Sequence, residues 1–206
     1  MARFTPISPV ELAEAIAERA AALEPRVCVA ISAADAAAPT ALADDVAARL
    51  RVAGRAADVV SLHDFVRPAS LRLEHGHTDP ASYRWDWFDY GALDREVVRA
   101  LHDRHRWLPR LWDEDCDRSA RAQRIEAPAG QVLVVAGPML LGRGLSFDLT
   151  VQLRMSRAAL ERRTSDVHRW TIAPLLEHDA SADADIVVKY DHPDRPAVRS
   201  ASEQGS

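Results

Sequence analysis

The segment over residues 26–50 constrains the fold of this 206-residue chain more than any other. It begins with a short apolar, β-branched run at residues 27–31, which is typical of a buried strand. A loop of Ser, Ala and Asp follows, and Pro39 then stands where a helix would begin, since proline's missing N–H costs no hydrogen bond there. Apolar residues recur at helical spacing up to Leu50. With a second strand at residues 57–62, the segment predicts a βαβ unit and hence a parallel sheet.

The loop between the first strand and its helix has the layout of a phosphate-binding loop without the chemistry of one. Such a loop needs glycines, which let the backbone approach phosphate, and a lysine that reaches the outer phosphates. Here Ala33, Ala36 and Ala38 stand at the glycine positions and Pro39 stands at the lysine position. Only Thr40 matches, at the position of the residue that would hold magnesium. We favour a plain strand-to-helix loop, at whose helix N-terminus an anion would bind weakly at most.

The composition argues against several classes of function. The net charge of −5 gives no reason to expect nucleic acid or an anionic membrane as a partner. No apolar run approaches the roughly 20 residues that span a bilayer. Two cysteines are too few for a disulfide framework, so we expect a cytoplasmic protein. Lys189 is the only lysine, so no other can replace the one missing from the loop.

The rest of the chain is predicted to complete one domain. We expect an N-terminal helix within residues 1–25 that packs on the domain, the domain itself over residues 26–196, and a disordered tail over residues 197–206. Residues 63–90 show no period and are predicted to form a long loop. Further strands are predicted at residues 131–135, 147–153 and 184–189, helices at 91–102 and 157–164, and a hairpin from 107–112 and 120–125.

Several motifs follow one another in a recognisable order. They are HDFVRP at residues 63–68, GHTDP at 76–80, YRWDWFDY at 83–90, AGPMLL at 136–141 and ERR at 161–163. Their order and spacing resemble the uridine kinase family of P-loop kinases over residues 26–196. The resemblance implies an α/β fold, a three-layer P-loop NTPase sandwich with a mainly parallel sheet and helices on both faces. It also implies ATP and Mg²⁺ as the cofactors of the family.

Three acidic positions of the family pattern are replaced in this chain. Ser32 stands at the end of the first strand, His63 at the position of the family's catalytic base, and Ala136 at the acid of the later strand. Together with the lost lysine and glycines, these substitutions fall on groups that handle phosphate and metal. Phosphoryl transfer depends on positioning and on charge neutralisation by such groups. The pattern therefore predicts a loss or strong reduction of ATP-dependent transfer.

The resemblance implies a catalytic role for His63 and Asp64. A histidine can act as a general base near neutral pH, and ligands of open α/β sheets bind beyond the carboxyl ends of the strands. The simpler interpretation is a polar strand end.

Substrate-binding and phosphate-binding residues are also implied. The substrate-binding candidates are Arg67, Tyr83, Asp86, Phe88 and Asp89; the alternative is that the aromatic residues belong to the core and the acids are solvated. The cofactor-binding candidates are Thr40, Arg162, Arg163 and Arg169, because arginine forks match phosphate oxygens. The alternative for these arginines is an exposed helix end. We expect no metal site, since no third ligand accompanies the histidine pairs at residues 75–77 and 102–105.

Three functions remain open from the sequence. The leading hypothesis is a divergent uridine kinase-like protein that no longer transfers phosphate and still binds a small nucleoside or nucleotide. The second is an active kinase that uses arginines in place of the lysine. The third is a regulatory or interaction protein in which side chains fill the cleft that binds ligands in the resembled kinases. The sequence leaves open a homo-oligomer.

Overall fold

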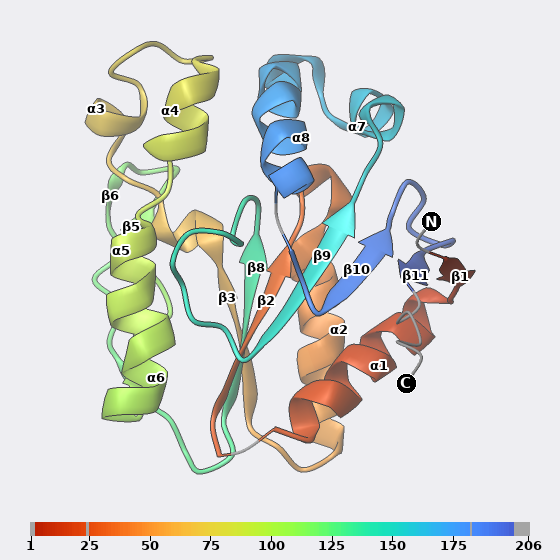
Figure 1. Cartoon of the computed structure of the whole chain (residues 1–206). Coiled ribbons are helices and arrows are strands. Elements are labelled where there is room, and N and C mark those ends of the chain that lie inside the picture. The colour runs from red at the N-terminus through yellow and green to blue at the C-terminus, as the bar shows by residue number, and fades with distance from the viewer. Residues whose placement is uncertain (1–2, 24, 182, 200–206) are drawn as a thin grey trace.

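The computed structural model describes residues 3–23, 25–181 and 183–199 (Figure 1). At its centre lies a seven-stranded sheet in the order β1-β11-β10-β9-β2-β8-β3. The strands are β1 (Phe4–Pro6), β2 (Val27–Ser32), β3 (Ala57–Ser61), β8 (Val132–Gly137), β9 (Leu149–Arg154), β10 (Ile186–Lys189) and β11 (Ala197–Arg199). The five strands from β10 to β3 run parallel. At one edge β11 is antiparallel to β10, and β1 is antiparallel to β11. The predicted class, α/β with a mainly parallel sheet, is confirmed.

The predicted central strand is the middle of the core. All six residues of β2 are buried, because the strand lies between β8 and β9 and helices cover it. A fully buried parallel strand must be apolar on both faces, and residues 27–31 satisfy that requirement. β3 pairs with β8 rather than with β2, so the predicted βαβ unit is parallel but spans one intervening strand.

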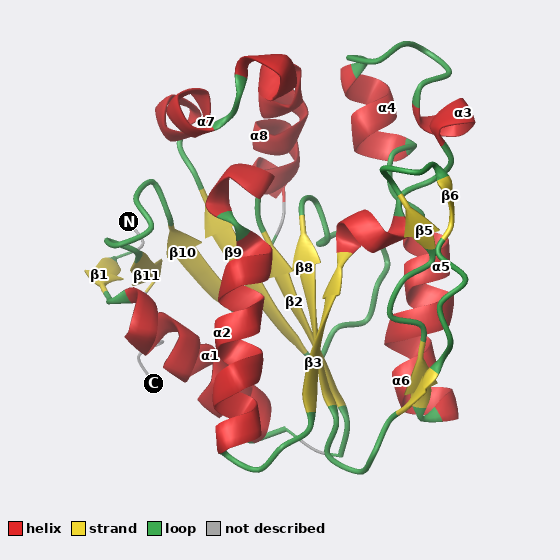
Figure 2. Cartoon of the chain, turned by 180° about the vertical axis from the view of Figure 1, so that it is seen from behind, coloured by secondary structure: helices red, strands yellow, loops and turns green. Residues whose placement is uncertain are grey.

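Two helices pack against each other on one face of the sheet (Figure 2). They are α1 (Pro9–Ala21) and α2 (Pro39–Val52). α1 begins with a capping box, in which Ser8 Oγ accepts from the Glu11 N–H and Glu11 Oε2 accepts from the Ser8 N–H. The predicted N-terminal helix and the predicted helix start at Pro39 are confirmed.

Residues 63–90 are more ordered than predicted. They contain the short helices η2 (Leu62–Phe65), α3 (Ala69–Arg72) and α4 (Pro80–Trp85). Asp79 caps α4 by accepting from the Ser82 N–H at 2.7 Å. Helices of this length bury too few apolar residues to give a periodic signal, which explains the wrong prediction of a structureless loop.

The predicted helix over residues 91–102 is interrupted. It consists of α5 (Tyr90–Leu93), a π-helical turn η3 (Asp94–Val98) and α6 (Arg99–Arg104). These helices lie beside the β3 edge of the sheet (Figures 1 and 2). The predicted hairpin exists as two short ladders. Its strands are β4 (Arg106–Trp107) with β7 (Ile125–Glu126), and β5 (Trp112–Asp113) with β6 (Arg118–Ser119).

The C-terminal part contains one predicted helix and two unpredicted elements. α7 (Arg157–Arg163) is the helix predicted at 157–164 and begins after the Ser156 cap, but η4 (Asp166–Thr171) and α8 (Ile172–Ser181) were missed. The prediction of a disordered tail from residue 197 is wrong for residues 197–199, because β11 pairs with both β1 and β10. Residues 200–206 lie outside the described residues.

Candidate functional site

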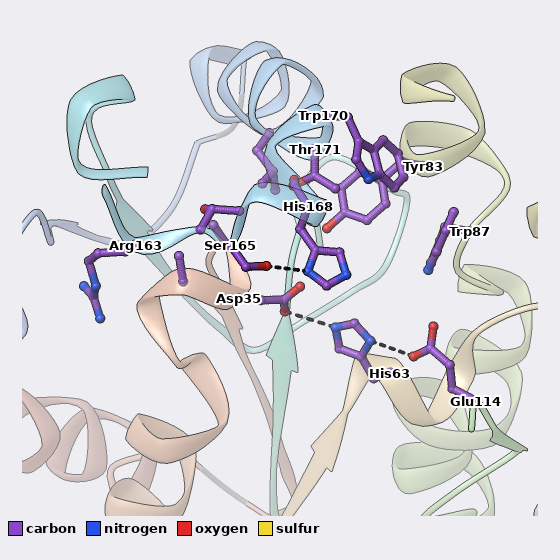
Figure 3. A pocket seen from close by; sticks show the side chains of 14 residues that line it. Asp35, His63, Tyr83, Trp87, Glu114, Arg163, Ser165, His168, Trp170 and Thr171 are labelled. Atoms are coloured by element: carbon purple, nitrogen blue, oxygen red, sulfur yellow. Dashed lines mark hydrogen bonds and ion pairs between the residues drawn. The ribbon is translucent and has the colours of Figure 1, made fainter. Parts of the chain in front are cut away.

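A cavity of about 650 Å³ lies beyond the carboxyl ends of β2 and β3 (Figure 3). Its walls come from the loop after β2, from η2 and α4, from the hairpin, and from the segment that joins α7 to α8. Ligands of open α/β sheets bind at this end of the strands. The cavity is therefore the candidate functional site.

The loop after β2 forms the floor of the cavity. It coils into a single 3-10 turn, η1 (Asp35–Ala37), in which the Ala37 N–H donates to Ala34 O at 2.8 Å and the Ala38 N–H donates to Asp35 O at 2.9 Å. Ala38 has φ +52°, a left-handed conformation that favours glycine. Two amides of the loop are thus used within the loop itself. Thr40 is exposed on α2 and does not line the cavity.

His63 is held between two carboxylates. Its Nε2 lies 3.0 Å from Asp35 Oδ1 and its Nδ1 lies 3.0 Å from Glu114 Oε2. Burial lowers the pKa of the imidazole, but the hydrogen bonds and charges of Asp35 and Glu114 outweigh burial and raise it to about 10. His63 is therefore an imidazolium at neutral pH, with both N–H groups donated. In this state it cannot accept a proton, so the structure does not favour the predicted general base.

Glu114 is a site residue that the sequence analysis missed. It lies in the loop of the hairpin, between β5 and β6, and its Oε1 accepts from Arg72 Nη1 at 2.8 Å. Burial raises the pKa of Glu114, but His63 and Arg72 outweigh it and hold the pKa below the ordinary value. Asp35 was also missed, although it stands within the loop that the sequence singles out. No local pattern links the two acids to His63, because the three residues lie on three separate segments of the chain.

The structure separates His63 from its neighbour Asp64. Asp64 Oδ1 accepts from Arg110 Nε at 2.7 Å, and Asp64 does not line the cavity. Burial raises the pKa of this carboxyl against the opposing effect of Arg110. Of the two predicted catalytic residues, only His63 lies at the cavity.

Aromatic side chains form the wall opposite the loop. Tyr83 lies 5.6 Å from Trp87, 6.0 Å from Phe88 and 5.4 Å from Trp170 between ring centroids. Phe88 is buried beneath the surface and meets the His63 ring edge-on at 5.5 Å. Burial raises the pKa of the Tyr83 hydroxyl well above its ordinary value, so it remains protonated. Of the predicted pair, Tyr83 lines the cavity and Phe88 lies behind it.

The other predicted substrate residues have local partners. Arg67 Nη1 donates to Asp86 Oδ1 at 3.3 Å. Asp89 Oδ1 accepts from the Ala92 N–H at 2.8 Å and so caps α5. None of the three lines the cavity.

The predicted phosphate-binding arginines do not converge. Arg162 is exposed, and Arg169 pairs with Asp166 at 2.9 Å. Arg163 lines the cavity, but Figure 3 shows its guanidinium directed away from Asp35 and His63. Its Nη1 is buried without a hydrogen-bond partner in the described part of the chain.

Two acidic positions of the family pattern are closed to solvent and to ligands. Ser32 is fully buried, and its Oγ accepts from the Leu140 N–H at 3.2 Å. Ala136 is fully buried beside it in β8. Within residues 3–23, 25–181 and 183–199, no group of three or more His, Cys, Asp or Glu side chains could hold a metal ion. No helix in the same ranges is long and apolar enough to cross a bilayer.

The sheet order and the cavity at the strand ends are those of a three-layer α/β sandwich. Comparison with solved structures agrees. A protein described as a possible uridine kinase from Bacillus stearothermophilus superposes with a TM-score of 0.69 at 17% identity, over 86% of this chain and 97% of the other. A candidate fructose transport system kinase from Silicibacter sp. TM1040 gives 0.68 at 22% identity, over 88% and 98%.

A third structure extends the range of substrates among the similar folds. D-glycerate 3-kinase from Cryptococcus neoformans superposes with a TM-score of 0.53 at 15% identity, over 86% of this chain and 82% of the other. No family model matches the sequence, and no curated protein matches it at a significant level. The chain thus has the three-layer α/β sandwich of the uridine kinase-like P-loop kinases, a nucleoside and sugar kinase fold.

Proposed function

We propose that this protein binds a small organic ligand of nucleoside size in the cavity and has lost, or nearly lost, ATP-dependent phosphoryl transfer. The single observation that supports this most is the state of the loop after β2. Its 3-10 turn uses the Ala37 and Ala38 amides for internal hydrogen bonds, although a phosphate-binding loop directs such amides at its ligand.

The charge at the floor of the cavity argues in the same direction. Asp35 lies in the loop where a triphosphate would need neutralisation, and Pro39 replaces the lysine that would supply it. The positive charge of His63 is already shared between Asp35 and Glu114. Because kinases depend on neutralising the transferred phosphoryl group, the residues present do not fit Mg·ATP.

The two alternatives have less support. A filled cleft is opposed by the open volume of about 650 Å³ next to His63 and Tyr83. An active kinase that uses arginines would need several of them to converge at the cavity. Arg162 is exposed and Arg169 is paired with Asp166, and Arg163, which does line the cavity, directs its guanidinium away from Asp35 and His63. The cytoplasmic location and the absence of nucleic-acid partners stay predictions from composition.

The test is a pair of measurements on the same preparation. The first is ADP release from Mg·ATP with uridine, cytidine, fructose or glycerate as acceptor, where we expect no turnover above the protein-free blank. The second is the shift of the unfolding midpoint with each acceptor alone. A ligand at a hundred times its Kd stabilises by about 2.7 kcal/mol, which is enough to detect. Mg²⁺-dependent turnover would refute the proposal.

A further inference from the structure

The hydroxyl of Tyr83 is directed into the cavity and makes no hydrogen bond to the described residues. The residue is 4% exposed, and its hydroxyl has no hydrogen-bond partner within the described part of the chain. Figure 3 shows the oxygen pointing toward the space between Asp35 and His168. Because Tyr83 lines the cavity, this hydroxyl is accessible from it, and a ligand group can take the place of the water that would otherwise bond it.

Asp35 faces the same space with one oxygen still open. Its Oδ1 bonds His63, whereas its Oδ2 has no hydrogen bond or ion pair within the described residues. His63 is one positive charge between two carboxylates, and Arg72 reinforces only the far one, Glu114. Arg163 also lines the cavity but directs its guanidinium away from Asp35, so negative charge is left at Asp35. A ligand that covers this carboxylate removes its water and must compensate its charge.

Aromatic rings surround the space on the other side. Tyr83 and Trp170 line it together, with centroids 5.4 Å apart, and Trp87 lies 5.6 Å from each. Arg72 already occupies one face of Trp87, at 5.2 Å from the ring centroid. Ring faces attract ammonium groups, and an adjoining carboxylate strengthens that attraction.

We propose that the cavity recognises an organic amine, whose ammonium group lies between Asp35 Oδ2, the Tyr83 hydroxyl and the ring of Trp170. The inference rests on the proposed ligand-binding function and specifies its ligand class. The charge of such a site is opposite to that of a phosphate-binding site, because the loop after β2 presents a carboxylate instead of amides and a lysine. A carboxylate or phosphate would be repelled by Asp35, and a hydroxyl would leave its charge uncompensated.

The test uses probes that differ only in the head group. Calorimetric titration compares tryptamine, tryptophol and indole-3-propionate, and phenethylamine with 2-phenylethanol, at pH 7. We expect each amine to bind at least about tenfold more tightly than its alcohol, and the carboxylate not to bind. Asp35→Asn should remove the preference for the amine. Tyr83→Phe should weaken the amine severalfold while the fold is kept.

A matched control keeps the comparison specific. Asp166→Asn removes the same charge from an exposed residue outside the cavity, and it should leave amine binding unchanged. Equal or tighter binding of the alcohols would overturn the inference, as would failure of every amine to bind at millimolar concentration. If uridine or fructose binds in either case, the proposed function survives without this ligand class. Mg·ATP turnover would instead remove the proposed function itself.

Discussion

Nε2 of His63 lies 3.0 Å from Oδ1 of Asp35, and this pair joins the end of β3 to the loop after β2. The same imidazole joins the hairpin through Glu114, so one side chain connects three segments at the floor of the cavity. In a phosphate-binding site that position would serve an anionic ligand. Here it is occupied by an internal ion pair.

The ion pair makes stability depend on pH in a defined window. The pKa of His63 is raised from 6.5 to about 10, so the folded state holds the proton more tightly than the unfolded state does. The stabilisation is complete below the unfolded pKa and is lost as pH rises from about 6.5 to about 10. We expect this loss in urea unfolding of the wild type and not in His63→Gln. The exposed His77→Gln should keep it, and identical pH profiles for the wild type and His63→Gln would contradict the ion pair.

The loop after β2 gives a test at two neighbouring alanines. Ala38 has φ +52°, whereas Ala37 lies buried within the 3-10 turn. Ala38→Gly relieves a left-handed alanine and should be neutral or stabilising by up to about 1 kcal/mol. Ala37→Gly adds chain entropy to the unfolded state and also removes a buried methyl, so it should destabilise by at least about 1 kcal/mol. Urea unfolding measures both, and the opposite order would show that the loop has another conformation.

Gly137 is required by the close approach of η2. A Cβ built on Gly137 would lie directly against Leu62 Cβ, which is fully buried. We expect Gly137→Ala to destabilise by about 1–3 kcal/mol through overpacking. Gly91→Ala is the matched control, since its nearest contact would be an ordinary 3.5 Å to Asp89 Oδ1. A thermal unfolding midpoint equal for the two variants would contradict the packing described.

Arg55 holds the end of α1 to the sheet. Its Nη1 donates to Ala21 O at 2.9 Å and Leu23 O at 2.7 Å, and its Nε donates to Gly130 O at 2.9 Å. Carbonyl groups at the end of a helix have no N–H partner within the helix, so they depend on Arg55. Arg55→Met should therefore lower the unfolding free energy by about 2 kcal/mol. Arg162→Met removes an exposed arginine and should change it by less than about 0.5 kcal/mol.

The fold could be predicted from sequence where local signals and burial agree. The run at residues 27–31 is buried on both faces, and Ser8 and Pro39 begin α1 and α2 as their capping chemistry requires. η2, α3 and α4 could not be predicted, because they are too short for a period. β11 was missed because its strand depends on pairing with β1, at the other end of the chain.

The site was predicted less well, for a related reason. His63 and Tyr83 were identified from motif order and do line the cavity. Asp64, Asp86 and Asp89 also match the motif, but they bond to partners outside the cavity. Glu114 could not be found, because only the folding of the hairpin brings it to His63. A motif gives the position of a residue along the chain, and tertiary packing decides where its side chain points.

The central claim is that the loop after β2 does not hold a triphosphate. The most direct measurement is calorimetric titration of the intact protein with Mg·ATP at pH 7. We predict no saturable binding at millimolar nucleotide, because the Ala37 and Ala38 amides are already bonded and Asp35 repels the phosphates. Saturable binding, weakened by Arg163→Met, would contradict the account and indicate a working kinase.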